Sequence, residues 1–157
     1  MKMYPDTESR AKFEYPLGGL MQLRDIVKEG ELPRSTMPDA NGEDCLIVVK
    51  NGATTGVTIG RASGVESFVR DYKESGIHST SMEIAIYPYS YKDGAFSAPG
   101  DSGSAIGDVN SRIVGMITGG AGKTDSSLDV TYASPYYFVD ECIKKAFPNS
   151  YLFPILA

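Results

Sequence analysis

The chain has 157 residues, enough for one domain with a real core or one β-barrel with appendages, but too few for two full barrels. Its 41% hydrophobic and 22% charged residues are ordinary for a globular protein. The 15 basic and 20 acidic residues give a net charge of −5 without a Lys/Arg cluster, and no apolar run approaches the ~20 residues that cross a bilayer, so we expect neither a nucleic-acid partner nor a membrane.

Residues 1–44 are interpreted as an N-terminal extension. The first 16 are polar and lack an apolar signal core, which predicts an irregular segment and, if the chain is complete, a cytoplasmic protein. A short amphipathic helix ending near Gly30 is predicted next, because four apolar residues recur at helical spacing: Leu20, Leu23, Ile26 and Val27. Prolines and an Asn-Gly pair then predict a connector from Glu31 to Asp44.

Residues 45–147 are interpreted as the folded domain, in which short strand-like runs alternate with turn residues. This texture predicts a mainly β protein, an antiparallel barrel or sandwich. If the first two runs form one bent strand, six strands result. The runs are Cys45–Lys50, Thr54–Arg61, Val65–Arg70, Met82–Tyr87, Ser104–Gly107, Arg112–Thr118 and Asp129–Ala133.

A C-terminal helix is predicted after Ser134 and Pro135, which suit its N-cap and first position. Acidic residues come early in this segment and Lys144 and Lys145 come late, in agreement with the helix dipole. Its apolar face is formed by Val139, Cys142, Ile143 and Ala146. Pro148 ends it, and residues 148–157 are interpreted as a tail.

The chain has two cysteines and one histidine. Cys45 and Cys142 both lie in apolar surroundings, so two buried free thiols are expected, with a single long-range disulfide as the alternative. One histidine and no Cys-x-x-Cys pair give no support to a metal site. We therefore expect no metal and no cofactor.

The loop from Ser97 to Ser104 carries the strongest chemical pattern. Gly100 and Gly103 allow a sharp turn, so that the Ser102 hydroxyl and neighbouring N–H groups can point into one small space. Such an arrangement suits a nucleophile beside an oxyanion site. An ordinary Gly-Asp-Ser turn between two strands is the alternative.

In three ordered segments the chain resembles the trypsin-like (chymotrypsin-fold) serine peptidases. The segment Gly100-Asp101-Ser102-Gly103 is similar to the family's nucleophile motif. The segment Arg112–Gly120 is similar to the strand that follows this motif. The segment Val48–Gly60 is similar to the opening of the second barrel in divergent trypsin-like domains, including fungal ones. The resemblance covers residues 45–147 and implies the six-stranded antiparallel second barrel followed by a helix.

The resemblance also implies site residues. Ser102 would be the nucleophile, and the N–H groups of Gly100 and Ser102 would form the oxyanion hole. Phe96 would lie at the base of the first specificity pocket, with its surroundings formed by Thr118, Gly119, Gly120 and Val130. With an aromatic ring at its base and no acidic residue, this pocket is expected to disfavour a basic substrate side chain and to be shallow and apolar, or plugged. In many family members the aspartate before the serine pairs with a freed N-terminal amine; the partner of Asp101 stays unassigned.

The rest of a catalytic triad is missing, because the family's histidine and aspartate come from the first barrel. His78 lies in the second-barrel region and reads as a solvent-facing loop residue. Two hypotheses stay open. The chain is the C-terminal half of a serine endopeptidase, inactive alone and completed by a first-barrel segment that supplies His and Asp for a peptide or protein substrate. Alternatively, it is a pseudoprotease barrel that binds protein.

A second motif, Gly122-Lys123-Thr124, ends like a phosphate-binding loop. Ile117 stands where that motif requires its first glycine, and the following residues lead into a strand instead of a helix. We therefore interpret this segment as a glycine-rich hairpin beside the cleft.

Overall fold

The computed structural model describes residues 18, 20–35, 37–39, 42–72, 76, 78–90, 92–122 and 129–152. The irregular segment predicted for the first 16 residues lies outside this part of the chain. No helix in the described ranges is long and apolar enough to cross a bilayer.

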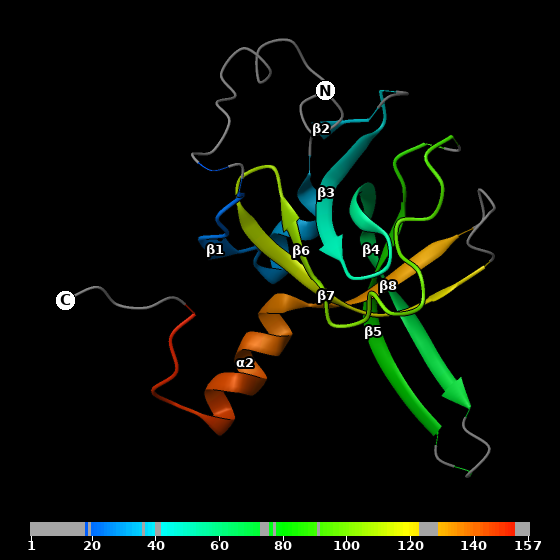
Figure 1. Ribbon diagram of the computed structural model, residues 1–157. Coiled ribbons are helices and arrows are strands. Elements are labelled where there is room, and N and C mark those ends of the chain that lie inside the picture. Colours follow the sequence, from blue (N-terminus) through cyan, green and yellow to red (C-terminus); the bar gives the residue numbers. More distant parts are fainter. Residues whose placement is uncertain are drawn as a thin grey trace.

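Six antiparallel strands form a closed ring of pairings (Figure 1). The order around the ring is β7–β6–β3–β4–β5–β8, and β8 pairs with β7 to close it. The prediction of a mainly β protein is therefore confirmed. The strands are β3 (Asp44–Gly52), β4 (Gly56–Tyr72), β5 (His78–Pro88), β6 (Ala105–Asp108), β7 (Arg112–Ala121) and β8 (Val130–Pro135).

Two predicted strands merge, but they are not the two that the sequence suggested. The runs at 45–50 and 54–61 are separate strands, because Gly56 at φ 64° turns the chain into a tight β3–β4 hairpin. The runs at 54–61 and 65–70 form one strand, β4, which continues through an irregularity between Ala62 and Glu66. The ring therefore has six strands, with boundaries that differ from the predicted ones, and two short strands lie outside it.

The prediction of an amphipathic helix that ends near Gly30 is wrong. Residues 25–26 form a short strand, β1 (Asp25–Ile26), parallel to the start of β7. The backbone N–H of Val27 also donates to the carbonyl of Ile113, at 2.9 Å. This segment forms a strand instead of a helix because β8 pairs with β7 only from Gly115 onward, which leaves the edge of β7 before Gly115 free to pair with β1. A 3₁₀ helix, η2 (Glu29–Arg34), follows, and β2 (Met37–Pro38) then pairs with β3.

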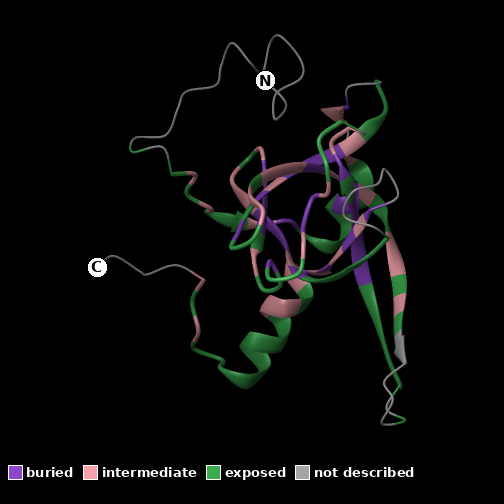
Figure 2. Cartoon of the chain, turned by 45° about the vertical axis from the view of Figure 1, so that its right-hand side comes forward, coloured by how far each residue is buried: buried purple, intermediate pink, exposed green. Residues whose placement is uncertain are grey.

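The hydrophobic core fills the ring (Figure 2). It includes Val27 and Leu32 from the N-terminal segment, which are 1% and 4% exposed. It also includes Phe96, which comes from the loop that precedes Ser102. The other members are Leu46, Val48, Ala62, Ile84, Ile86, Ile106, Val114, Ile117 and Ala133. The candidate nucleophile loop is thus tied to the core by the residue that precedes it.

The predicted C-terminal helix is confirmed as α2 (Tyr136–Ala146), but its expected cap is not. Ser134 belongs to β8, and no side chain caps the helix. No residue of α2 is buried, and its Lys144 pairs with Asp140 at 2.6 Å. Both cysteines are free, as expected; however, Cys142 is exposed on α2 and Cys45 is only half-buried, so the prediction that both are buried is wrong.

Candidate active site

The loop that carries Ser102 is fixed at both ends by backbone hydrogen bonds. The N–H of Asp101 donates to the carbonyl of Ala98 at 3.0 Å, and the N–H of Gly103 donates to the carbonyl of Ile117 at 2.8 Å. Gly100 and Gly103 have φ angles of 104° and 86°, which side-chain-bearing residues rarely adopt. A Cβ at Gly100 would also overlap the Thr54 hydroxyl. Both glycines are therefore required by the shape of the loop.

Ser102 lies at the exposed tip of this loop. Its backbone N–H and that of Gly100 make no hydrogen bond to any residue that the structure describes. The intervening N–H, that of Asp101, is by contrast used to close the turn. Neither of the two predicted oxyanion donors is thus used by the described residues.

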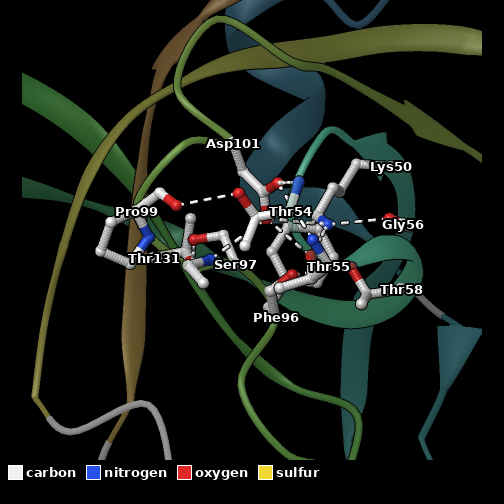
Figure 3. Close-up of polar contacts among 11 residues, drawn as sticks. Lys50, Thr54, Thr55, Gly56, Thr58, Phe96, Ser97, Pro99, Asp101 and Thr131 are labelled. Atoms are coloured by element: carbon white, nitrogen blue, oxygen red, sulfur yellow. Dashed lines mark hydrogen bonds and ion pairs between the residues drawn. The ribbon is translucent and has the colours of Figure 1, made fainter.

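In contrast to the exposed Ser102, Asp101 is completely buried. Its Oδ1 accepts hydrogen bonds from the backbone N–H groups of Thr54 and Thr55, at 2.7 and 3.2 Å (Figure 3). Its Oδ2 accepts from the Thr55 hydroxyl at 2.6 Å and from the N–H of Ala98 at 3.1 Å. One carboxylate therefore joins the β3–β4 hairpin to the Ser102 loop.

The partner of Asp101 that the sequence left unassigned is Lys50. Its ammonium lies 3.2 Å from Asp101 Oδ2, and both side chains are fully buried. Lys50 Nζ also contacts the Thr55 hydroxyl, donates to the carbonyl of Gly56 at 2.9 Å and lies 5.8 Å from the centre of the Phe96 ring. All three ammonium hydrogens thus have an acceptor, which a buried ion pair needs if it is to tolerate desolvation.

Asp101 is ionised at neutral pH. Burial opposes its ionisation, but the hydrogen bonds from the Thr55 hydroxyl and from the N–H groups of Thr54, Ala98 and Thr55 hold its pKa well below the usual range. The pair is therefore a carboxylate against an ammonium. A signal for it was present in the sequence, since Lys50 interrupts an apolar strand just before a Gly-x-x-Thr-Gly turn.

A cavity of about 310 Å³ opens beside Ser102. The loop contributes Ser97, Ala98, Pro99 and Ser102, while β7 and the residue after it contribute Ile117, Gly119, Gly120, Ala121 and Gly122. Asp129 completes the lining. Of the predicted pocket residues, Gly119 and Gly120 line this cavity.

The other three predicted pocket residues do not line it. Phe96 is 1% exposed and packs in the core. The Thr118 hydroxyl donates to Glu83 or to the carbonyl of Tyr132, at 3.1 and 3.2 Å, away from the cavity. Val130 lies between Asp129 and Thr131 in β8, and successive strand residues face opposite sides of a sheet.

Asp129 contradicts the expectation of a pocket without an acidic residue. It is 5% exposed, and the backbone N–H of Phe96 donates to its carboxylate. Burial raises the pKa of Asp129 more than this hydrogen bond lowers it. The surroundings thus lower the pKa of Asp101 and raise the pKa of Asp129.

His78 is remote from Ser102, in line with the expectation that it is not the base. Gly103 is bonded to Ile117, which pairs through Ala133 with Ile84 on β5. His78 starts β5, six residues before Ile84, which corresponds to roughly 20 Å along the strand. As for the phosphate-loop motif, Gly119–Ala121 belong to β7, and Lys123 and Thr124 lie outside the described residues.

No family model matches the chain, and no curated protein matches it either. Among solved structures, it is similar to a glutamic acid-specific serine protease reported to use a novel histidine triad in substrate binding, with 20% identity and a TM-score of 0.49. The alignment covers 85% of this chain and 56% of that protease, so the chain spans little more than half of its length. At this level the likeness concerns the fold alone.

We expect Lys50→Met to lower the free energy of unfolding by about 3–5 kcal/mol, because it leaves the buried Asp101 carboxylate without its counter-charge. Lys144→Met, which removes the exposed partner of Asp140, is the matched control and should cost less than about 1 kcal/mol. Urea titration of the three proteins measures both values. Equal stability of the two variants would contradict the assigned role of Lys50.

We also expect the stabilising effect of Asp101 to depend on pH. Its pKa in the folded protein lies below the value of about 3.9 for an unfolded chain, so its contribution is present above pH ~4 and is lost as pH falls toward the folded pKa. The difference in unfolding free energy between wild type and Asp101→Asn should therefore shrink below pH ~4. A difference that is constant from neutral to acid pH would show that Asp101 is not ionised in the fold.

Proposed function

We propose that this chain is the nucleophile-bearing half of a trypsin-like serine endopeptidase, with Ser102 as the nucleophile and peptides or proteins as substrates. The observation that carries the proposal is an exposed Ser102 in the wall of a cavity, on a turn between two positive-φ glycines. The N–H groups of Gly100 and Ser102 make no hydrogen bond within the described residues, which leaves them available as donors. The closed ring of six antiparallel strands and the terminal helix support its assignment to the second-barrel type.

In this mechanism the Ser102 hydroxyl attacks the scissile carbonyl while a general base takes its proton. The carbonyl oxygen becomes an oxyanion that accepts hydrogen bonds from the N–H groups of Gly100 and Ser102. One such donor is worth on the order of 3 kcal/mol in the transition state. The base passes this proton to the leaving amine as the C–N bond breaks, and water, deprotonated by the same base, then hydrolyses the acyl ester so that Ser102 regains its proton.

The buried pair of Lys50 and Asp101 supports a loop that is competent without activation cleavage. In many trypsin-like peptidases a freed N-terminal amine must reach the aspartate before this loop takes its active shape. Here the ammonium comes from a strand of the same domain, 3.2 Å from the carboxylate. The charge that orders the loop is therefore present as soon as β3 and β4 have formed their hairpin.

The base must come from elsewhere, because the single histidine lies roughly 20 Å along β5 from the register of Ile117. We assign it to a first-barrel segment that supplies His and Asp. The same observation favours a second candidate function, a catalytically inactive pseudoprotease barrel that binds protein through the cavity. The two differ in whether Ser102 can be activated.

A fluorophosphonate probe, which labels activated serines, separates the two functions. We expect labelling only when the chain is combined with a His-containing barrel segment encoded upstream, and not in the isolated chain. Ser102→Ala should abolish labelling, whereas Ser104→Ala, which removes a neighbouring hydroxyl of the same loop, should retain it. Intact-mass spectrometry measures the adduct. Absence of an adduct in every combination would favour the pseudoprotease.

A further inference from the structure

The turn that precedes Ser102 has a central peptide bond that can adopt two orientations. The N–H of Asp101 donates to the carbonyl of Ala98 at 3.0 Å, so residues 98–101 form a β-turn with Pro99 and Gly100 at its centre. A φ of 104° at Gly100 identifies the type II form. In the type I form the peptide between Pro99 and Gly100 is rotated by roughly half a turn, while the ends of the turn keep their places.

The Lys50–Asp101 pair fixes the ends of this turn but not its central peptide. The carboxylate of Asp101 accepts from the N–H of Ala98 at 3.1 Å, and this contact is compatible with both turn types because it involves only the end residues. Pro99 has no N–H to donate, and the N–H of Gly100 has no partner among the described residues. The orientation of the central peptide therefore depends on the partner of the Pro99 carbonyl.

That partner is the side chain of Thr54, in the turn between β3 and β4. Its hydroxyl donates to the carbonyl of Pro99 at 2.9 Å (Figure 3). The C=O and N–H of one trans peptide point in opposite directions. A Pro99 carbonyl that is held toward the hairpin therefore directs the Gly100 N–H away from it. In the type I form the carbonyl and the N–H would exchange sides.

We propose that Thr54 is a positioning residue whose hydroxyl sets the direction of the Gly100 N–H. It selects the type II orientation, in which this N–H serves as an oxyanion donor. In the other orientation the Pro99 carbonyl would take the place of the donor and would repel an oxyanion. The link to catalysis rests on the proposed peptidase function; the hold on the peptide does not. Thr54 thus acts in two ways, since its backbone N–H binds Asp101 and its hydroxyl orients the peptide before Gly100.

The test follows the orientation of this peptide by NMR in the full chain, without a partner or a reaction. The nuclear Overhauser effect between Pro99 Hα and the amide proton of Gly100 is strong at a Pro99 ψ of about +120°, the type II value, and weak at about −30°, the type I value. Exchange between the two forms also produces relaxation dispersion at the ¹⁵N resonance of Gly100 on the μs–ms timescale. Both observables report the central peptide and not the stability of the fold.

We expect Thr54→Ala to raise the population of the type I form relative to type II by about 2-fold to 10-fold, the range for one neutral hydrogen bond. The nuclear Overhauser effect should weaken, and dispersion should appear at Gly100. Thr54→Ser keeps a hydroxyl and should keep both observables at their wild-type values. Thr58→Ala is the matched control, because it removes a hydroxyl that donates to the Phe96 carbonyl at 2.7 Å, and it should leave Gly100 unchanged.

Spectra of Thr54→Ala that match those of Thr54→Ser would overturn the proposal, as would an equal change in Thr58→Ala. The outcome is independent of fluorophosphonate labelling, because the measurement involves neither a base nor an adduct. A Gly100 peptide that depends on the Thr54 hydroxyl, in a protein that is never labelled, would support the positioning role and count against the peptidase function.

Discussion

The candidate site depends on one buried ion pair. The ammonium of Lys50 and the carboxylate of Asp101 lie 3.2 Å apart with no exposure to solvent, where an unpaired charge would be severely destabilising. The pair is tolerated because every ammonium hydrogen and both carboxylate oxygens have partners, mostly from the turn at Thr54 and Thr55. Position 52 also has to be glycine, since a Cβ there would overlap the Asp101 carboxylate. The shape of the Ser102 loop follows from these contacts.

Asp101 and Asp129 are two carboxylates near one serine whose surroundings differ. Asp101 accepts four hydrogen bonds and faces an ammonium, so its pKa is lowered and its role is structural. Asp129 has the N–H of Phe96 and a buried oxygen without a hydrogen-bond partner, and burial raises its pKa. Phe96 links the two, because its ring lies under Lys50 while its backbone supports Asp129. A core residue thus contacts both the buried ion pair and Asp129.

The sequence predicted those features of the fold that depend on residues close together in the chain. The glycines around Ser102, the β6 and β7 runs and the helix before Pro148 could all be read from the sequence, since each depends on residues nearby. The structure of the N-terminal segment could not be predicted in this way. Its apolar residues have helical spacing, but residues 25–26 pair with a free edge of β7 that exists only in the folded ring. Contacts such as that of Thr54 with Asp101, 47 positions apart, give no periodic signal. Asp129 was missed because residue type does not reveal which residues next to a strand border a cavity.

The central claim is that the Lys50–Asp101 pair holds the Ser102 loop in shape. Amide hydrogen exchange tests it most directly, because the N–H groups of Thr54 and Ala98 donate to Asp101. The account predicts that Lys50→Met accelerates exchange at these two amides well beyond the general effect of lost stability, with Ile84 in β5 as the internal reference. Acceleration of equal size at all three amides, or none at Thr54 and Ala98, would contradict it.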